Sequence, residues 1–270
     1  MFKISNGRRG FLIRIQEKIF LSLVSLTFLI GIIVTSLEMW IFALFTILMN
    51  SIYYIFHKEY RLLSSLLNSF LVGFLFFQIA SNQLGDLEIT KELIILLNRC
   101  LLIIIILAMI FSQILNKRRI TFFTKIPEWS RRISLPFHSI RLSYFLLISF
   151  LFSFTILIPP FFLKETDIDS VLLFALFFSF INATLEEFIW RGILLSGLRE
   201  YVSSFYAIII TSLGFGLYHI SIGIPLIFSL LFAFGGLFYS IVVLKSNSIY
   251  PAILLHIVIN IGMVLNGWII

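Results

Sequence analysis

The chain consists largely of nine apolar runs, each 15 to 25 residues long and separated by short polar connections. A helix rises 1.5 Å per residue, so about 20 apolar residues cross the hydrocarbon core of a bilayer. Charged residues make up only 12% of the chain, about half the share found in soluble domains. We therefore predict an all-α fold, a polytopic integral membrane protein built as a bundle of eight or nine transmembrane helices. The predicted spans are 19–36, 39–56, 62–81, 93–115, 142–163, 171–195, 205–219, 224–244 and 249–266.

Basic residues alternate between the connections along the whole chain. Lys and Arg occupy the N-terminal tail and the even-numbered connections, whereas the odd-numbered connections are mainly acidic or carry no charge. Cytoplasmic loops of membrane proteins carry an excess of Lys and Arg. We therefore expect a cytoplasmic N-terminus and, with nine spans, an external C-terminus. If two of the late, short runs form one span, the count becomes eight and only the C-terminus changes side.

The longest connection, 116–141, holds seven basic residues and divides the chain. We expect it to lie on the cytoplasmic membrane surface, where basic side chains meet anionic lipids. It ends an N-terminal transmembrane region, 1–141, whose helices carry almost nothing ionisable; Arg99 is an exception that we expect to extend toward the membrane surface. The second region, 142–270, holds the functional candidates within 171–267. The single cysteine, Cys100, excludes an intramolecular disulfide and a cysteine-based metal site.

Five ionisable residues lie inside the last spans rather than at their ends. A charge at the bilayer centre costs about 2.5–3.5 kcal/mol on insertion scales. Ionisable residues inside membrane spans therefore usually have a function. The five in this chain are Glu186, Glu187, Arg191, His219 and His256.

The two adjacent glutamates face different directions on a helix. Glu187 and Arg191 are four residues apart, share a helix face and are expected to form an ion pair. Glu186 points about 100° away and lacks that partner. A carboxylate removed from water suits a general base that acts near neutral pH. The alternative is structural: both glutamates pair with Arg191 and with polar neighbours such as Asn182.

The histidines lie on later helices. His219 ends an apolar run, where a histidine is more often structural than catalytic, although Gly214 and Gly216 would let another helix approach closely. His256 and Asn260 are four apart and project from one face of the last helix. Imidazole and carboxamide donors both serve in oxyanion holes. The alternative for this pair is a set of hydrogen bonds between helices, worth about 1 kcal/mol or less.

The depths of these groups set a condition on the fold. If its span ends near Leu195, Glu186 lies about 13 Å from the cytoplasmic face. His219 comes out about 10 Å deeper if its span begins at Phe205. We therefore expect that span to begin later, or residues 191–204 to fold back, if the two groups act together.

Three motifs occur in a fixed order: Glu-Glu-x-x-x-Arg at 186–191, Phe-x-x-x-His at 215–219 and His-x-x-x-Asn at 256–260. Together they resemble the CPBP family, the CAAX protease and bacteriocin-processing membrane proteins, also called Abi. The resemblance covers 171–267, about a third of the chain, and includes Gly192 and the Ser-Ile-Tyr-Pro stretch at 248–251.

The resemblance extends to the type II CAAX prenyl endopeptidases, and it implies a membrane-embedded peptidase that cuts a hydrophobic or prenylated peptide or protein. Carried over to this sequence, Glu186 and His219 would activate water, and His256 and Asn260 would hold the oxyanion. Glu187 and Arg191 would support the helix and orient the site. These roles need no cofactor.

Zinc is the alternative, with Glu186, His219 and His256 as ligands, since a catalytic zinc takes three protein ligands and water. No His-Glu-x-x-His helix is present.

Two other functions stay open. One is bacteriocin self-immunity, or partnership with a membrane sensor, without essential proteolysis. The other is a proton-coupled transporter in which Glu186, His219 and His256 relay protons; the absence of an internal repeat counts against it. The expected partners are a hydrophobic or prenylated substrate, the lipid bilayer and a sensor or bacteriocin-system protein, but no nucleic acid. The family type and the charge asymmetry indicate a bacterial cell (inner) membrane.

Overall fold

The computed structural model describes the backbone of residues 6–118, 121–134, 139–157 and 168–269. Side chains are described for 17–118, 121–133, 139–155 and 171–269. Within these ranges nearly all regular structure is helical, which confirms the predicted all-α membrane fold. The predicted span 142–163 and the acidic connection after it fall partly on residues 158–167, which lie outside the described ranges.

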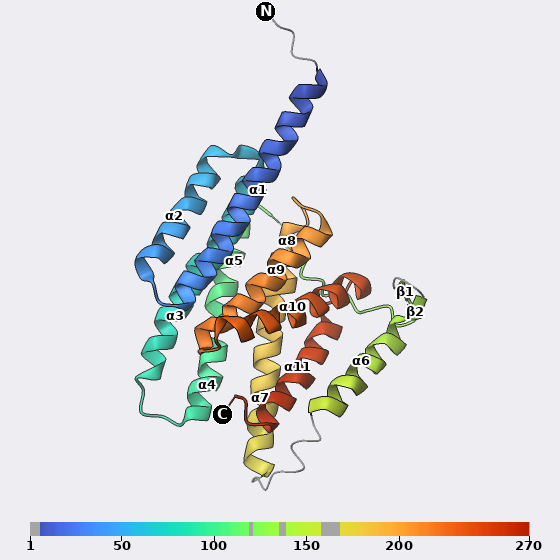
Figure 1. Ribbon diagram of the computed structural model, residues 1–270. Coiled ribbons are helices and arrows are strands. Elements are labelled where there is room, and N and C mark those ends of the chain that lie inside the picture. Colours follow the sequence, from blue (N-terminus) through green and yellow to red (C-terminus); the bar gives the residue numbers. More distant parts are fainter. Residues whose placement is uncertain (1–5, 119–120, 135–138, 158–167, 270) are drawn as a thin grey trace, which may run out of the picture.

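Where the structure describes them, the apolar runs are found in helices, and the late runs form separate helices (Figure 1). Within the described ranges, six segments are long and apolar enough to cross a membrane: Glu17–Ser36, Lys58–Gly85, Lys91–Leu115, Val171–Leu198, Ser204–Ile222 and Leu226–Ser246. Three further apolar helices are shorter: Trp40–Phe56, Leu142–Thr155 and Tyr250–Leu265. The bounds in the first part of the chain are α1 (Asn6–Ser36), α2 (Trp40–Phe56), η1 (Lys58–Tyr60), α3 (Arg61–Gly85), α4 (Lys91–Cys100) and α5 (Leu102–Leu115). Those in the second part are α6 (Leu142–Leu157), α7 (Ile168–Glu187), the π-helix η3 (Phe188–Leu195), α8 (Ser196–Leu198), α9 (Ser204–Tyr218), η4 (His219–Ile222), α10 (Leu226–Ser246) and α11 (Tyr250–Leu265).

One large hydrophobic core joins the two parts of the chain. Phe28 of α1 and Phe70 and Phe74 of α3 are fully buried in it, together with Trp190 of η3 and Tyr218 of α9. The Trp190 ring lies 5.0 Å from that of Phe70 and 6.2 Å from that of Tyr218, measured between centroids. Helices from before and after the long connection therefore share one packed interior.

Helices α9 and α10 approach each other closely, as the glycines of α9 led us to expect. A Cβ atom on Gly216 would lie 2.7 Å from the carbonyl oxygen of Ser229, and one on Gly236 would lie 3.0 Å from Cα of Ser212. Only residues without a side chain allow this crossing. Figure 1 shows that α10 runs across the bundle at a steep angle to α7.

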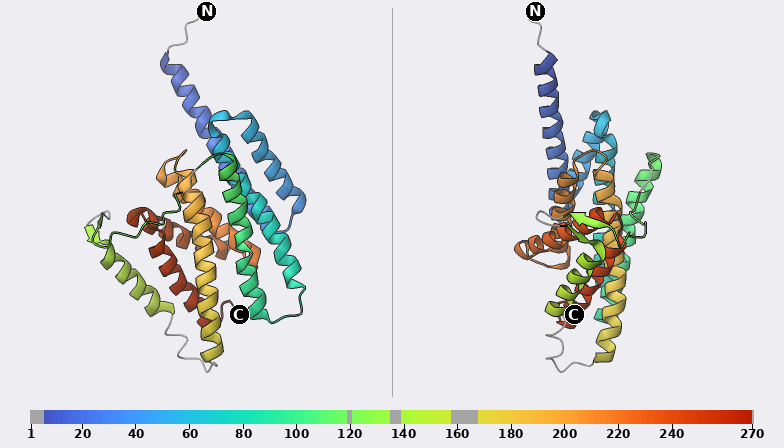
Figure 2. Two further views of the ribbon diagram at one scale, coloured as in Figure 1. Left: turned by 180° about the vertical axis from the view of Figure 1, so that it is seen from behind. Right: turned by 90° about the vertical axis from the view of Figure 1, so that its right-hand side faces the viewer.

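The connections group at two ends of the molecule as the charge alternation predicts. The turns between α2 and α3, α5 and α6, and α8 and α9 lie toward the end from which α1 projects, whereas the α1–α2 and α3–α4 turns lie toward the other (Figures 1 and 2). The turn before α11 joins the first group, since the amide of Ile249 donates to the carbonyl of Phe123 at 2.8 Å. Basic connections thus share one end.

The long connection contains a small hairpin that the sequence did not predict. Strands β1 (Arg132–Ser134) and β2 (Ser139–Arg141) pair antiparallel, with Arg132 opposite Arg141. Phe122 and Phe123 both adopt positive φ angles of 46° and 52°. Residues other than glycine rarely adopt positive φ angles. This backbone conformation places the carbonyl group of Phe123 against the start of α11.

Candidate functional site

The adjacent glutamates end the α-helical part of α7, and a π-helix continues from them. Eight residues of π-helix, η3, are unusual because π-helical geometry occurs mostly as single turns, often at functional sites. Glu186 is 1% exposed, and Glu187 and Arg191 are 0% exposed. The whole Glu-Glu-x-x-x-Arg motif is therefore buried inside the helical bundle.

The predicted ion pair between Glu187 and Arg191 is confirmed. Nη1 of Arg191 donates to Oε1 of Glu187 at 2.8 Å, and Nη2 donates to the carbonyl oxygen of Gly236 at 2.9 Å. The guanidinium carbon lies 4.6 Å from the ring centroid of Phe215 and 5.2 Å from that of Tyr239. A cation that is away from water gains both from its counter-ion and from aromatic faces. Arg191 thereby ties η3 to α9 and α10.

His256 is oriented by the same carboxylate. Its Nδ1 lies 3.0 Å from Oε1 of Glu187, and its ring stacks on Tyr239 with centroids 4.9 Å apart. A carboxylate only accepts hydrogen bonds, so Nδ1 carries a proton in this contact. Nε2 then faces Oε2 of Glu186 at 3.7 Å. His256 consequently lies between the two glutamates, with a different ring nitrogen toward each.

Arg99 of α4 also reaches this cluster, which corrects two of our expectations. Its side chain does not extend to the membrane surface: the residue is 7% exposed, and Nη1 lies 3.7 Å from Oε1 of Glu186. Glu186 therefore has a cation beside it, although that cation is not Arg191. The N-terminal helices, which we expected to carry almost nothing ionisable, supply a charge to the site. The only sequence signal was an arginine that lies well inside a predicted span.

The cluster is balanced in formal charge. Two carboxylates, Glu186 and Glu187, face two guanidinium groups, Arg99 and Arg191. A buried charge without a partner is strongly destabilising, whereas a pair with good hydrogen bonds is tolerated. This balance explains how four charged side chains fit inside an apolar bundle.

His219 lies at the edge of the cluster. It is 6% exposed, its Nδ1 lies 2.8 Å from the carbonyl oxygen of Phe215, and its ring stacks on Phe232 at 4.1 Å. Since a carbonyl only accepts, Nδ1 donates and Nε2 is the nitrogen left for other partners. Among the described residues, His219 makes no hydrogen bond or ion pair with Glu186.

Neither of the two expected ways to bring Glu186 and His219 to the same depth is found. Helix α9 begins at Ser204 rather than later, and residues 191–204 do not fold back into the bundle. Instead, the helix that carries Glu186 continues to Leu198 through η3 and α8. This extension moves Glu186 further from the end of its helix and so brings its depth closer to that of His219.

Asn260 follows His256 by one turn of α11 and is 4% exposed. Its Nδ2 has no hydrogen-bond partner among the described residues. A buried amide donor that no protein group engages is free to bind a ligand oxygen.

The zinc alternative would need Glu186, His219 and His256 to come together around one ion. Within the described residues, no three His, Cys, Asp or Glu side chains are grouped as metal ligands. Both oxygens of Glu186 instead face cationic or imidazole nitrogens at 3.7 Å.

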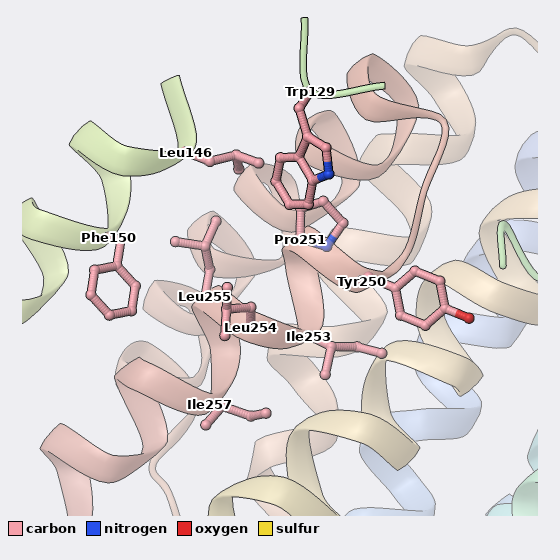
Figure 3. Close-up of a pocket in the computed structure, with 9 residues that line it drawn as sticks. All are labelled: Trp129, Leu146, Phe150, Tyr250, Pro251, Ile253, Leu254, Leu255 and Ile257. Carbon is pink, nitrogen blue, oxygen red and sulfur yellow. The ribbon is translucent and has the colours of Figure 1, made fainter. Parts of the chain in front are cut away.

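The apolar groove in Figure 3 lies on the other side of α11. It has a volume of about 320 Å³ and opens between α6 and α11 beneath Trp129. Leu254 lines it, and residues two apart on a helix point about 160° from each other, so His256 is directed away from it. His256 is not among the residues that line the groove.

The candidate membrane spans define a polytopic membrane protein. Its helical bundle buries two carboxylates, two guanidinium groups and two histidines, which form a candidate hydrolytic site. The family described as type II CAAX prenyl endopeptidase Rce1-like matches residues 168–262. This segment contains all six predicted site residues and confirms the resemblance drawn from the motifs. At the level of the family, the match supports a CAAX-type intramembrane protease. Comparison with curated proteins and with solved structures found no match.

Proposed function

We propose that this protein is an intramembrane endopeptidase that hydrolyses a peptide bond in a hydrophobic or prenylated peptide or protein. One observation carries the proposal: His256, oriented by Glu187 at 3.0 Å, faces Glu186 at 3.7 Å inside the membrane bundle. A carboxylate and an oriented imidazole, placed together away from bulk water, are the groups that water activation and oxyanion stabilisation require.

In this mechanism Glu186 is the general base. Its carboxylate takes a proton from a water molecule while the water oxygen adds to the carbonyl carbon of the substrate. When the C–N bond breaks, the proton passes from Glu186 to the departing amine, so that the glutamate returns to its starting state. Nε2 of His219, left available by the Nδ1 contact with Phe215, helps to hold the water.

His256 and Asn260 stabilise the tetrahedral oxyanion. In its protonated form His256 donates from both nitrogens, from Nδ1 to Glu187 and from Nε2 to the oxyanion. Asn260 adds its Nδ2 donor, which no described residue engages. Glu187 and Arg191 hold this geometry by joining η3, α10 and α11.

The test is cleavage by the purified protein in detergent, read by mass spectrometry on a peptide library that includes prenylated peptides. Glu186→Gln is compared with the wild type and with Glu200→Gln, a matched change at a half-exposed surface glutamate. We expect the wild type and Glu200→Gln to cut, and Glu186→Gln to lose activity at a temperature at which it is still folded, below its own melting temperature. Cutting by Glu186→Gln would overturn the proposal.

Each assay is run with and without a chelator of divalent metals. Unchanged cleavage is expected from a glutamate-dependent reaction without a metal, whereas loss of cleavage would restore the zinc alternative. If the wild type cuts nothing, the immunity or sensor-partner function is tested by asking whether Glu186→Gln keeps the phenotype. Proton-coupled uptake in vesicles would instead support a transporter.

We infer that the protein resides in a bacterial cell (inner) membrane, with its N-terminus and the long connection on the cytoplasmic side. Support comes from the basic connections, which group at one end of the molecule. The partners follow from this placement: the bilayer, a hydrophobic or prenylated substrate and, for the immunity alternative, a bacteriocin-system protein or membrane sensor.

A further inference from the structure

We propose that Arg99 is the counter-ion of Glu186 and acts as a positioning residue for the reaction, so that α4 completes the site of the C-terminal helices. The catalytic part of this inference rests on the proposed function; the pairing of the two residues does not. Arg99 lies outside the segment that matches the family.

A chain of hydrogen bonds holds Arg99 in place. Nη2 donates to Oδ1 of Asn98 at 2.7 Å, and Nη1 donates to Oδ1 of Asn182 at 3.4 Å. Asn98 in turn donates to Ser81 of α3. These hydrogen bonds hold the guanidinium group of Arg99 from α3, α4 and α7, independently of its ion pair with Glu186. A flexible arginine near a helix end would instead extend to the membrane surface.

The other charges around Glu186 do not replace Arg99. The charged or titratable groups that act on Glu186 are Glu187 and Arg191 on its own helix, His256 on α11 and Arg99 on α4. The hydroxyl group of Tyr218 on α9 faces both Glu186 and Arg99. Arg191 and His256 already bind Glu187 at 2.8 and 3.0 Å. Among the described residues, Arg99 is thus the cation near Glu186 that is not bound to the other carboxylate.

The distance between the two charges suits catalysis. Nη1 of Arg99 lies 3.7 Å from Oε1 of Glu186, close enough to stabilise the negative charge but too long for a hydrogen bond. Oε2 has no hydrogen-bond partner among the described groups. Arg99 therefore favours the carboxylate form of Glu186 and leaves one oxygen free to take a proton from water.

The first experiment compares the pH dependence of kcat/KM in the wild type, Arg99→Gln and Arg99→Lys. Without the cation, Glu186 holds its proton to higher pH, so we expect Arg99→Gln to lose about tenfold or more activity near neutral pH, since each pH unit of displacement is a factor of ten. Its acid limb should move to higher pH, and Arg99→Lys should recover part of the activity. Arg118→Gln, at the surface ion pair with Glu200, should change neither.

The second experiment does not depend on catalysis. Melting temperatures in detergent are measured for Arg99→Gln, Glu186→Gln and the double variant. If the residues are paired, Arg99→Gln melts lower than the wild type because it leaves a buried carboxylate unpaired, and adding Glu186→Gln restores part of the loss.

Additive effects on melting temperature, or an acid limb that stays in place in Arg99→Gln, would overturn the proposal. If the wild type cuts no peptide but the two substitutions remain coupled, the proposed function fails while the pairing of Arg99 with Glu186 stands. If Arg99→Gln does not fold, Arg99→Lys is measured alone and with Glu186→Gln; because lysine keeps the charge but not the contacts to Asn98 and Asn182, a smaller coupling of the same sign is expected, and additive effects would overturn the pairing.

Discussion

Nδ1 of His256 lies 3.0 Å from Oε1 of Glu187, although 68 residues separate them in the chain. The same oxygen accepts a hydrogen bond from Arg191 at 2.8 Å. One buried carboxylate atom therefore connects a histidine of α11 with an arginine of η3. Because this contact commits Nδ1, it determines which ring nitrogen of His256 faces Glu186.

Replacing Glu187 with Gln should destabilise the protein strongly. The change leaves the Arg191 guanidinium without its counter-ion in a fully buried place, where the loss of one partner costs about 3–5 kcal/mol. We expect a lower free energy of unfolding in mixed micelles and, because His256 loses its orientation, lower activity even below the melting temperature.

The control is Glu200→Gln, which removes the surface pair with Arg118 at 3.4 Å. Exposed pairs contribute about 0–1 kcal/mol, so this variant should unfold like the wild type. Equal effects of the two substitutions would show that the Glu187 carboxylate does not hold a buried network.

Asn260→Ala should separate catalysis from stability. The loss of one oxyanion donor lowers kcat by about 10²–10³, while KM should stay close to the wild-type value because the donor acts on the transition state. The melting temperature should change little, since Nδ2 of Asn260 has no partner among the described residues.

Asn260→Asp is the near-isosteric comparison for this position. It exchanges the donor for an acceptor and adds a negative charge beside the proposed oxyanion, so it should reduce kcat at least as much as Asn260→Ala. Full activity of Asn260→Asp would remove Asn260 from the oxyanion site.

Much of this arrangement could be predicted from residue spacing. Four-residue intervals on helices placed Arg191 beside Glu187 and put His256 and Asn260 on one face, because local helix geometry determines those relations. The apolar runs located the main helices of the described residues, because about 20 apolar residues in a row suit a membrane-spanning helix. Confirmation of the fold and of one ion pair does not extend to the catalytic roles, which stay predictions.

Relations between distant helices could not be predicted in this way. Arg99 pairs with a residue 87 positions later, and Tyr239 stacks on His256 from another helix. Neither has a local pattern that indicates its partner. The same limit applies to the hairpin in the long connection, whose strands have three residues each, and to the π-helix, which has no distinct sequence period.

Gly216→Ala should disrupt the crossing of α9 and α10. The added Cβ would lie 2.7 Å from the Ser229 carbonyl and 2.9 Å from atoms of Ala233, so the backbones must separate. His219 follows on η4 and would shift with α9. Overpacking of this kind costs about 1–3 kcal/mol of stability. We therefore expect a lower melting temperature and reduced cleavage.

Gly235→Ala is a matched control on α10. Its nearest neighbour would be a Tyr239 ring atom at 3.9 Å, an ordinary contact. Since alanine favours helix over glycine by about 1 kcal/mol, this variant should melt at the wild-type temperature or above it. If Gly216→Ala behaved in the same way, the close crossing would not be needed for stability.

The orientation in the membrane can be measured with single cysteines. Cys100 is the only cysteine in the chain, so Cys100→Ser provides a background without thiols. Lys125→Cys lies in the long basic connection, and Glu88→Cys lies in the acidic turn between α3 and α4. We expect a membrane-impermeant maleimide to label Glu88→Cys in intact cells and Lys125→Cys only in inverted vesicles.

This result would place the long connection in the cytoplasm, as its seven basic residues predict. The reverse labelling would invert the protein and place the long connection outside the cytoplasm. Labelling of both positions from one side would mean that the segment between them does not cross the membrane a single time. The single span Lys91–Leu115, which consists of α4 and α5, would then need to be reassigned.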